Sequence, residues 1–390
     1  MTKPLDVKRC LPIVLTALLA VNMPIAIYAD SATEDRPANV IRFATFNASL
    51  SGKTVDELPK RLTTSDDEQL KKIAAIIQTV RPDVLLINEF DHDPTGQLAA
   101  DFQTNYLGVP QDNTEPITFA HAYSPAVNTG LPTEIDLDGD GQVGGPGDAH
   151  GWGDFPGQYG MLLLTQSDDP PRKIVDQQRK LWSRFPGSNY PQDHYPAEAE
   201  KILRLSSKTH QMLRMTVRGT DCSVFISHPT PPVFDGPEDR NGKRNHDEVR
   251  MIAMTCIRSV DQFHRPIVIL GDLNADPNDG ESIPGTVDQL LNDRRFSDPQ
   301  PRSRGAVAKA IADGGANATH KTDPALDTAD WNDAPPRGSG NLRVDYVIPT
   351  HDWTVVDAGV FWPRPDEPSY ELINASDHRL VWVDLNVSAD

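Results

Sequence analysis

The stretch VILGDLNADPND, residues 268–279, begins with apolar residues and then changes abruptly to acids and amides. Its apolar start is typical of a short buried strand. Gly271 follows, and Asp272, Asn274 and Asp276 then stand on alternate positions. Buried carboxylates and amides lose their hydration, so a chain keeps them beside a buried strand only where something compensates them. This stretch therefore marks a candidate site at the end of a strand.

Apolar segments of strand or helix length recur along the chain. Strands are predicted over residues 41–47, 83–90, 161–165, 223–227, 267–270, 344–348 and 380–387. Residues 65–80 and 245–263 carry an apolar stripe at helical spacing, and Ser65 and Asn245 each precede a Glu at capping-box spacing. Because some strands follow one another without a helix between them, the pattern predicts an α/β fold with mixed sheets.

The chain is predicted to consist of a leader and one domain. Basic residues precede an apolar run near the N-terminus, which is typical of a secretory signal peptide over residues 1–30. A membrane anchor is the alternative, but a polar residue and a proline interrupt the run. We therefore expect export to the periplasm or the cell exterior, with no membrane span after cleavage. The remainder, 31–390, is predicted to be a single domain with long insertions at about 105–158 and 296–342.

Two cysteines follow the predicted leader. Cys222 lies in an apolar strand pattern, and Cys256 lies on the apolar face of a predicted helix. In an exported chain, a disulfide between them and a pair of buried thiols both fit this placement.

The formal net charge is −19. This charge argues against a broad basic surface for salt-driven binding to nucleic acid. An acidic protein that acts on a phosphate needs metal ions or a local basic cluster to offset the repulsion. Two segments carry local cations, and they supply these candidates for substrate binding: Lys208, His210, Arg240, Arg244 and Asn245.

Polar side chains stand at the ends of several predicted strands, which suggests a shared site at one edge of a sheet. They include Asn47, Glu89, His228, Asp272 and His378. Carboxylate and amide oxygens suit Mg²⁺, Mn²⁺ or Ca²⁺, whereas a zinc site would require a tight His/Cys cluster. A set of carboxylates, metal and histidines is what water attack on a phosphoester requires.

The segments NASL, INEFD, SHPTPP, GDLNADP, RVDYVIP and SDHRLVWVDL occur in this order between residues 40 and 388. Together they resemble the endonuclease/exonuclease/phosphatase superfamily, which includes pancreatic-type deoxyribonucleases, abasic-site endonucleases, sphingomyelinases and inositol phosphatases. The resemblance implies an α/β fold that is a four-layer sandwich, in which two packed mixed β-sheets are flanked by helices. It also implies an exported, bacterial-type member of this family.

The resemblance implies a role for each matched position. The metal is expected at Asn47 and Glu89, with Asp377 joining or supporting it. Attack on phosphorus is expected to involve three residues: Asp272, which positions or deprotonates the water; Asn274, which orients phosphate oxygens; and His378, which contacts the phosphate. Two further catalytic residues are expected: Asp345, which orients His378, and His228, which stands near the leaving group. Tyr159 is the nearest candidate partner of His228 and a candidate for substrate binding.

The segment EIDLDGDGQVGGPGD, residues 134–148, resembles an EF-hand calcium loop. Aspartates occupy loop positions one, three and five, and a glycine occupies position six. Gly147 stands where an acid is expected, so the loop is incomplete or borrows a ligand such as Asp154; a solvated acidic turn is the alternative. A structural Ca²⁺ is predicted at Asp136, Asp138, Asp140 and Asp148.

The leading functional prediction is an exported, monomeric, divalent-metal-dependent phosphoesterase. It would hydrolyse a small phosphate mono- or diester by metal-assisted attack of water. Trp331, in a predicted substrate-covering loop, could stack on the organic group of the substrate. The alternatives are an extracellular nuclease that cuts DNA or RNA and a calcium-stabilised, non-catalytic binding module.

Overall fold

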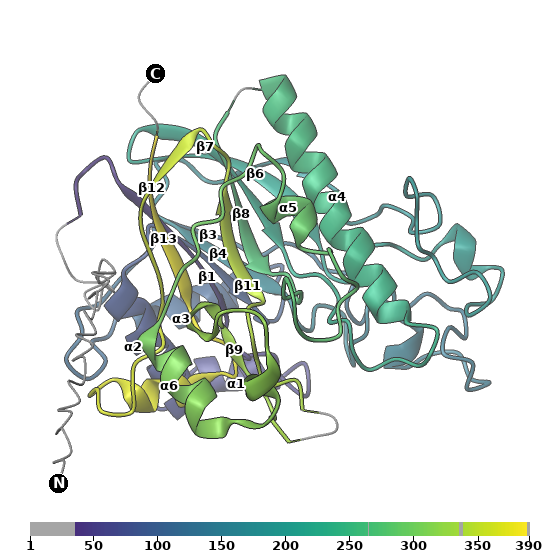
Figure 1. Ribbon diagram of the computed structural model, residues 1–390, viewed down its shortest axis with the longest axis horizontal. Coiled ribbons are helices and arrows are strands. Elements are labelled where there is room, and N and C mark those ends of the chain that lie inside the picture. The colour runs from purple at the N-terminus through teal and green to yellow at the C-terminus, as the bar shows by residue number, and fades with distance from the viewer. Residues whose placement is uncertain (1–35, 264, 335–337, 388–390) are drawn as a thin grey trace, which may run out of the picture.

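Two mixed β-sheets face each other at the centre of the molecule in the computed structural model (Figure 1). The structure describes residues 36–263, 265–334 and 338–387. The predicted signal peptide, residues 1–30, lies outside these ranges.

The first sheet has six strands in the order β12-β13-β1-β2-β4-β3. Only β1 and β2 are parallel neighbours in it; the other neighbouring strands are antiparallel. Its strands are β1 Ile41–Asn47, β2 Val84–Asn88, β3 His121–Tyr123, β4 Met161–Thr165, β12 Trp353–Val360 and β13 Val381–Val387.

The second sheet has five strands in the order β11-β8-β7-β6-β5. Here β7 and β8 are the parallel pair, and the remaining neighbours are antiparallel. Its strands are β5 Arg172–Asp176, β6 His210–Val217, β7 Thr220–Ser227, β8 Ile267–Asp272 and β11 Asp345–Pro349.

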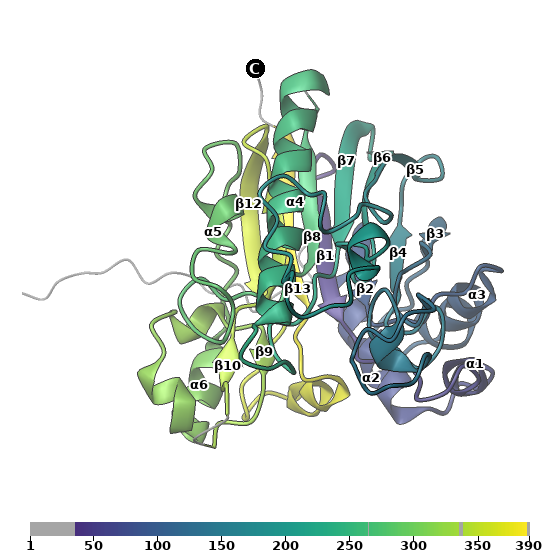
Figure 2. The same cartoon turned by 90° about the vertical axis from the view of Figure 1, so that its right-hand side faces the viewer.

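Side-chain alternation along the strands builds the four layers. Phe43 points into the core between the sheets, whereas Phe46 packs on the outer face of the first sheet. That outer face is covered by α1 Glu57–Leu62, α2 Glu68–Val80 and α3 Gln97–Phe102. The other outer face is covered by α4 Arg240–Phe263 and α5 Asp288–Leu291 (Figure 2). The predicted four-layer sandwich is confirmed.

Shorter elements lie in the connections. They are α6 Arg304–Asp313, β9 Ala329–Asp330, β10 Asn341–Leu342, the π-helix η1 Gln103–Leu107, and the 3₁₀-helices η2 Pro146–Asp148, η3 Ala199–Lys201, η4 Gly315–Thr319, η5 Pro324–Leu326 and η6 Tyr370–Ala375. The predicted insertion at 296–342 therefore has a helix and a small ladder of its own. Within the described ranges, no helix combines the length and the apolar character needed to cross a bilayer.

Both predicted helix caps are wrong. Helix α2 is capped by Asp67, whose carboxylate accepts a hydrogen bond from the Leu70 amide, and not by Ser65. Helix α4 begins at Arg240, so Asn245 lies inside it. The Asn245 side chain instead donates to the carbonyls of Thr230 and Leu273. Asn245 therefore serves to join α4 to the segments that carry Thr230 and Leu273, and it does not cap the helix.

The disulfide alternative is also contradicted. Cys222 and Cys256 are both free and buried. Cys222 belongs to the core between the two sheets, whereas Cys256 packs in the core between the second sheet and α4. The sheet itself separates the two thiols.

Candidate active site

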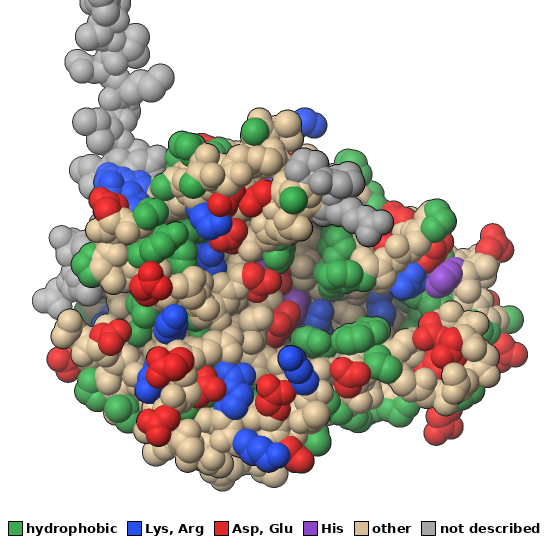
Figure 3. Space-filling model, turned by 90° about the horizontal axis from the view of Figure 1, so that it is seen from below, with side chains coloured by type: hydrophobic (Ala, Val, Ile, Leu, Met, Phe, Trp, Pro, Cys, Tyr) green, Lys and Arg blue, Asp and Glu red, His purple; other side chains and the backbone are tan. Residues whose placement is uncertain are grey.

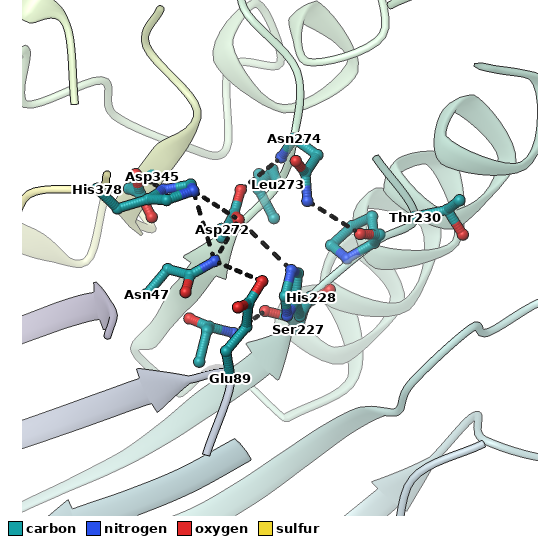
Figure 4. Close-up of polar contacts among 12 residues, drawn as sticks. Asn47, Glu89, Ser227, His228, Thr230, Asp272, Leu273, Asn274, Asp345 and His378 are labelled. Carbon is teal, nitrogen blue, oxygen red and sulfur yellow. Dashed lines mark hydrogen bonds and ion pairs between the residues drawn. The ribbon is translucent and has the colours of Figure 1, made fainter. Parts of the chain in front are cut away.

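Four strand ends bring the predicted polar residues to one edge of the sandwich. Asn47 ends β1, Glu89 follows β2, His228 follows β7 and Asp272 ends β8. Because each sheet contributes one parallel pair, the carboxyl ends of β1 and β2 lie together, as do those of β7 and β8. The side chains converge between the sheets (Figure 4). Viewed from below, the molecule has a hollow in which acidic, basic and histidine side chains gather (Figure 3).

Asn47 links the two sheets at this site. Its Nδ2 lies 3.1 Å from Glu89 Oε1 and 3.1 Å from Asp272 Oδ2. The same atom lies 3.5 Å from His378 Nε2. The Asn47 Oδ1 accepts a hydrogen bond from the amide of Ser49. One amide group thus faces three of the predicted functional side chains.

His378 is oriented by Asp345, as the sequence resemblance implied. Its Nδ1 lies 2.9 Å from Asp345 Oδ2, which also accepts a hydrogen bond from the Thr328 hydroxyl. Its Nε2 points toward Asp272, at 3.8 Å from Oδ2. Burial lowers the pKa of His378, but the carboxylates of Asp345 and Asp272 outweigh it and raise the pKa to about 10. His378 is therefore an imidazolium at neutral pH.

Asp272 is an ionised carboxylate between two histidines. Its Oδ2 lies 3.4 Å from His228 Nε2. Burial alone would raise its pKa, but His378 and His228 hold the pKa below its usual range. Burial, followed by the nearby Lys208, lowers the pKa of His228 to about 4, so His228 is neutral at pH 7. The two histidines therefore carry different charges.

Two residues of the site have left-handed backbone conformations. The φ angle is 59° at Glu89 and 52° at Asn274. A non-glycine residue in this region costs of order 1 kcal/mol and persists only where its surroundings hold it. Asn274 is held by its amide, which donates to Asp272 Oδ1, and by its Nδ2, which donates to the carbonyl of Pro229. The turn after β8 is thus tied to the loop after β7.

Lys208 brings a buried amine to the site. The residue is 6 % exposed. Its pKa is lowered chiefly by burial, and the carboxylates of Glu248, Glu89 and Asp272 oppose that shift. Burial likewise raises the pKa of Glu89, against the effect of His378 and the Asn47 hydrogen bond. The site therefore holds both charge signs at low hydration, which strengthens their interaction.

The other predicted substrate-binding cations are engaged elsewhere. Arg240 pairs with Glu238. Arg244 donates to the carbonyls of Leu205, Arg204 and His150. Together with Asn245, described above, Arg244 contributes to the packing of loops around α4 rather than to an open basic pocket.

Sequence reasoning missed Glu248 as a support for the site. It is fully buried on α4 and accepts hydrogen bonds from the amides of Ser207 and Thr230. It thus fixes the loop that carries Lys208 and the loop that follows His228. A run of polar residues on the otherwise apolar stripe of the helix is the sequence signal that could have identified it.

Asp377 and Trp331 lie beside the site and contact each other. Trp331 Nε1 donates to Asp377 Oδ2 at 3.0 Å, and the Trp331 ring meets the His378 ring edge-on at 5.3 Å. Asp377 is exposed, and its carboxylate is directed to the tryptophan. Asp377 can therefore support His378 through Trp331.

The calcium-like loop brings three of the four predicted ligands together. Asp136, Asp138 and Asp148 offer oxygens within 4.8 Å of one another, and Asp140 and Asp154 are outside this group. Asp148 lies one position beyond the usual loop length. A Cβ on Gly147 would lie 2.0 Å from Asp138 Oδ2, so any larger residue there would displace the Asp138 carboxylate.

His210 is fully buried behind the site. Its Nδ1 pairs with the Ser206 hydroxyl at 2.7 Å, and its Nε2 has no partner among the described residues. Burial, with Lys208 nearby, lowers its pKa to about 3.

We expect His210 to make the fold acid-sensitive. In the unfolded state His210 binds a proton near pH 6.5, whereas in the folded state it does so only near pH 3. The free energy of unfolding is therefore unaffected by His210 above pH 6.5 and falls progressively as the pH drops from 6.5 toward 3. Urea unfolding of His210→Gln should show a dependence on pH that is shallower by about 1.4 kcal/mol per pH unit between those limits. The exposed His351, changed to Gln, is the control. An unchanged slope in His210→Gln would contradict the expectation.

The donor set at the strand ends fits a hard divalent cation. Glu89 and Asp272 offer carboxylate oxygens, and the amide of Asn47 stands within 3.1 Å of both. Rotation of that amide would turn its oxygen toward the carboxylates, at the loss of the hydrogen bond that Oδ1 accepts from Ser49. Asp272 is buried and Glu89 is half-buried. Two such carboxylates facing one point favour positive charge there, and oxygen ligands suit Mg²⁺ or Mn²⁺. Asp272, Asp345 and His378 also offer ligand atoms within 4.8 Å of one another.

Comparison with known proteins gives one family. The Endonuclease/Exonuclease/phosphatase family matches residues 44–378 of the chain. No curated protein matches the sequence significantly.

Solved structures with a similar arrangement are distant in sequence. An endonuclease/exonuclease/phosphatase from Beutenbergia cavernae is 19% identical, with a TM-score of 0.48, over 90% of this chain and 72% of that one. A truncated TDP2 from Caenorhabditis elegans is 14% identical, with a TM-score of 0.47, over 90% and 100% of the two chains. The mannosyl-6-phosphatase Bt3783 from Bacteroides thetaiotaomicron is 11% identical, with a TM-score of 0.46, over 88% and 99%.

Proposed function

The chain belongs to the Endonuclease/Exonuclease/phosphatase family of metal-dependent phosphoester hydrolases, and we propose that it hydrolyses a small phosphate ester outside the cytoplasm. The observation that carries this proposal is the convergence of Asn47, Glu89, Asp272 and His378 between the two sheets. Export and a monomeric state are part of the proposal. They are supported by the leader pattern of residues 1–30 and by the acidic charge of the chain.

In the proposed reaction, a water oxygen forms a bond to phosphorus while the ester P–O bond breaks. A divalent metal, held by Glu89 and Asn47 with Asp272 beside them, would neutralise charge on the phosphate oxygens. The low pKa of Asp272 makes it a weak base, so it serves chiefly to orient the water through a hydrogen bond. The His378 imidazolium stabilises negative charge on the phosphoryl oxygens.

The arrangement of cations favours a small ester over a nucleic-acid strand. Lys208 lies buried at the site, whereas Arg240 and Arg244 bind a carboxylate and carbonyls. A nucleic-acid strand is usually bound along a track of exposed cations. The formal charge of −19 further opposes a long polyanion. The buried amine of Lys208, beside the carboxylates of the site, instead suits one phosphate.

The proposal is tested by turnover after chelation, with Mg²⁺, Mn²⁺ and Ca²⁺ restored separately. The substrates are an aryl phosphomonoester, an aryl phosphodiester, glucose 6-phosphate and plasmid DNA. We expect metal-restored release from a small ester and no nicking of DNA. Preferred cleavage of DNA would replace the small-ester proposal with a nuclease. The absence of turnover on every substrate, with metal bound, would favour a binding module.

A structural calcium ion at residues 136–148 is a separate part of the proposal. Three carboxylates held together in a loop repel one another, and Ca²⁺ with its preference for oxygen ligands would relieve that repulsion. We expect millimolar Ca²⁺ to raise the melting temperature of the protein, and Asp136→Asn to abolish most of the increase. Asp140→Asn, which changes an acid outside the group, is the matched control. An equal Ca²⁺ effect in the wild type and in Asp136→Asn would exclude the site.

A further inference from the structure

A cavity with a basic wall lies at the end of the sandwich opposite the active site. It has a volume of about 290 Å³, and its wall includes three arginines and one aspartate: Arg36, Arg81, Arg218 and Asp83. Asp83 directly precedes β2 and Arg218 directly precedes the turn into β7, so the cavity lies where these strands begin, whereas the active site lies where they end. The length of β2, between Asp83 and Glu89, separates the two places by roughly 20 Å.

The carboxylates near the cavity are already occupied by hydrogen bonds. Asp83 Oδ2 accepts from Arg36 Nη1 at 2.8 Å and from the Arg42 amide at 2.8 Å. The other oxygen, Oδ1, accepts from Arg218 Nη2 at 2.9 Å. The neighbouring Asp384 is bound by two nitrogens of the Arg42 guanidinium. Together with the third arginine of the wall, four guanidinium groups therefore face two carboxylates, an excess of two positive charges.

Several donors of these arginines have no partner among the described residues. Arg81 donates from Nη1 to the carbonyls of Glu115 and Pro116, which leaves its Nε and Nη2. Arg218 donates to Asp83 from Nε and Nη2, which leaves its Nη1. A guanidinium presents its five N–H groups in a planar fork that matches the oxygens of phosphate or carboxylate. The cavity thus combines an excess of positive charge with unused donors.

Two of the arginines are fixed in unusual backbone conformations. The φ angle is 52° at Arg81, which ends α2, and 50° at Arg218, in the turn between β6 and β7. Glycine or asparagine is the usual residue at such positions, because other side chains are strained there. The hydrogen bonds of the two guanidinium groups to Asp83 and to loop carbonyls offset that strain. A ligand would therefore meet donors that are already in place, which lowers the entropy cost of binding.

The charge and the position of the donors restrict the class of ligand. A dianion matches the excess of two positive charges, whereas a monocarboxylate matches half of it. Arg81 leads into β2 of the first sheet, and Arg218 belongs to the second sheet. A tetrahedral oxyanion has several oxygens and can accept from donors on both sides. Phosphate meets both conditions, and a cavity of this volume can hold it.

We propose that Arg36, Arg81 and Arg218 form a second anion site, which binds a phosphate dianion at the end of the sandwich remote from the reaction. The site does not depend on the proposed hydrolysis, although that reaction would release the same ion. A ligand that binds the folded chain alone stabilises it, so phosphate should raise the melting temperature through this site.

The test is calorimetric titration of the chelated protein with inorganic phosphate, with the ionic strength held constant by chloride. Arg81→Gln and Arg218→Gln should each weaken the binding at this site at least roughly ten-fold, the effect of losing a charge-assisted hydrogen bond. His378→Ala, which removes a cation of the active site, should leave this binding intact. Arg184→Gln removes an exposed arginine from the segment that packs on α4 and is the matched control. Acetate, a monoanion, should bind more weakly than phosphate.

Melting temperatures in chloride and in phosphate complete the test. Arg81→Gln leaves the pair between Arg218 and Asp83 in place, so it still reports on the ligand if Arg218→Gln fails to fold. Phosphate should raise the melting temperature of the wild type and of His378→Ala, but not that of Arg81→Gln. The proposal is overturned if the wild type binds no phosphate, if Arg81→Gln retains the wild-type affinity, or if Arg184→Gln weakens binding equally. Equal affinity for acetate would overturn the assignment to a dianion.

Discussion

Asp272→Asn is expected to lower kcat at least about 10³-fold, with a much smaller effect on KM. Asp272 Oδ2 is the common neighbour of Asn47, His228 and His378, at 3.1, 3.4 and 3.8 Å. The substitution keeps the shape but removes the charge that orients the water and supports the His378 imidazolium. Losses of 10²–10³ are typical when one electrostatic contact to a transition state is removed, and Asp272 makes several. The measurement is steady-state turnover with saturating metal.

Loss of folding would give the same loss of turnover, so stability is measured in parallel. Glu281→Gln is the matched control because Glu281 is an exposed acid in the same connection after β8. It should leave kcat within two-fold. If Asp272→Asn keeps its melting temperature and more than a tenth of the wild-type kcat, Asp272 is not the residue that orients the water.

The strands that carry the site were predictable because their interiors are continuously apolar. Residues 84–88 of the strand predicted over 83–90 form β2, and 267–270 form most of β8. The strand at Trp353–Val360 was missed because it is an edge strand with alternating partial exposure, so its apolar pattern is weak. Polar residues directly after buried strands predicted which side chains the structure brings together, since desolvation makes such placements rare without a compensating partner.

Charge alone could not predict which basic side chains lie at the site. Lys208 and Arg244 occur in similar basic segments, yet Lys208 lies among the site carboxylates and Arg244 binds backbone carbonyls. The difference depends on which loops pack on α4, and sequence spacing does not encode that packing. The same holds for Glu248, whose partners Ser207 and Thr230 are 41 and 18 residues away along the chain.

His378→Ala is expected to lower kcat by about 10³-fold or more, and Asp345→Asn by roughly 10²-fold. His378 is a buried cation whose Nε2 lies 3.8 Å from Asp272 Oδ2, and in the proposed reaction its loss removes the positive charge that stabilises the phosphoryl oxygens. Asp345 acts through His378: it holds Nδ1 at 2.9 Å and is the largest electrostatic contribution that raises the pKa of the imidazole. Changes to such supporting partners typically cost 10–100-fold.

Combining the two substitutions distinguishes a catalytic His378 from a merely structural one. If the imidazolium contacts the phosphate, the double variant His378→Ala/Asp345→Asn should be no slower than His378→Ala alone, because Asp345 has nothing left to orient. Independent structural roles would instead make the two losses multiply. Asp345→Asn should also lose activity at a lower pH than the wild type as pH rises, since His378 then deprotonates more easily. If the two losses in kcat multiply and the pH profile of Asp345→Asn matches that of the wild type, the Asp345–His378 pair has no role in the mechanism.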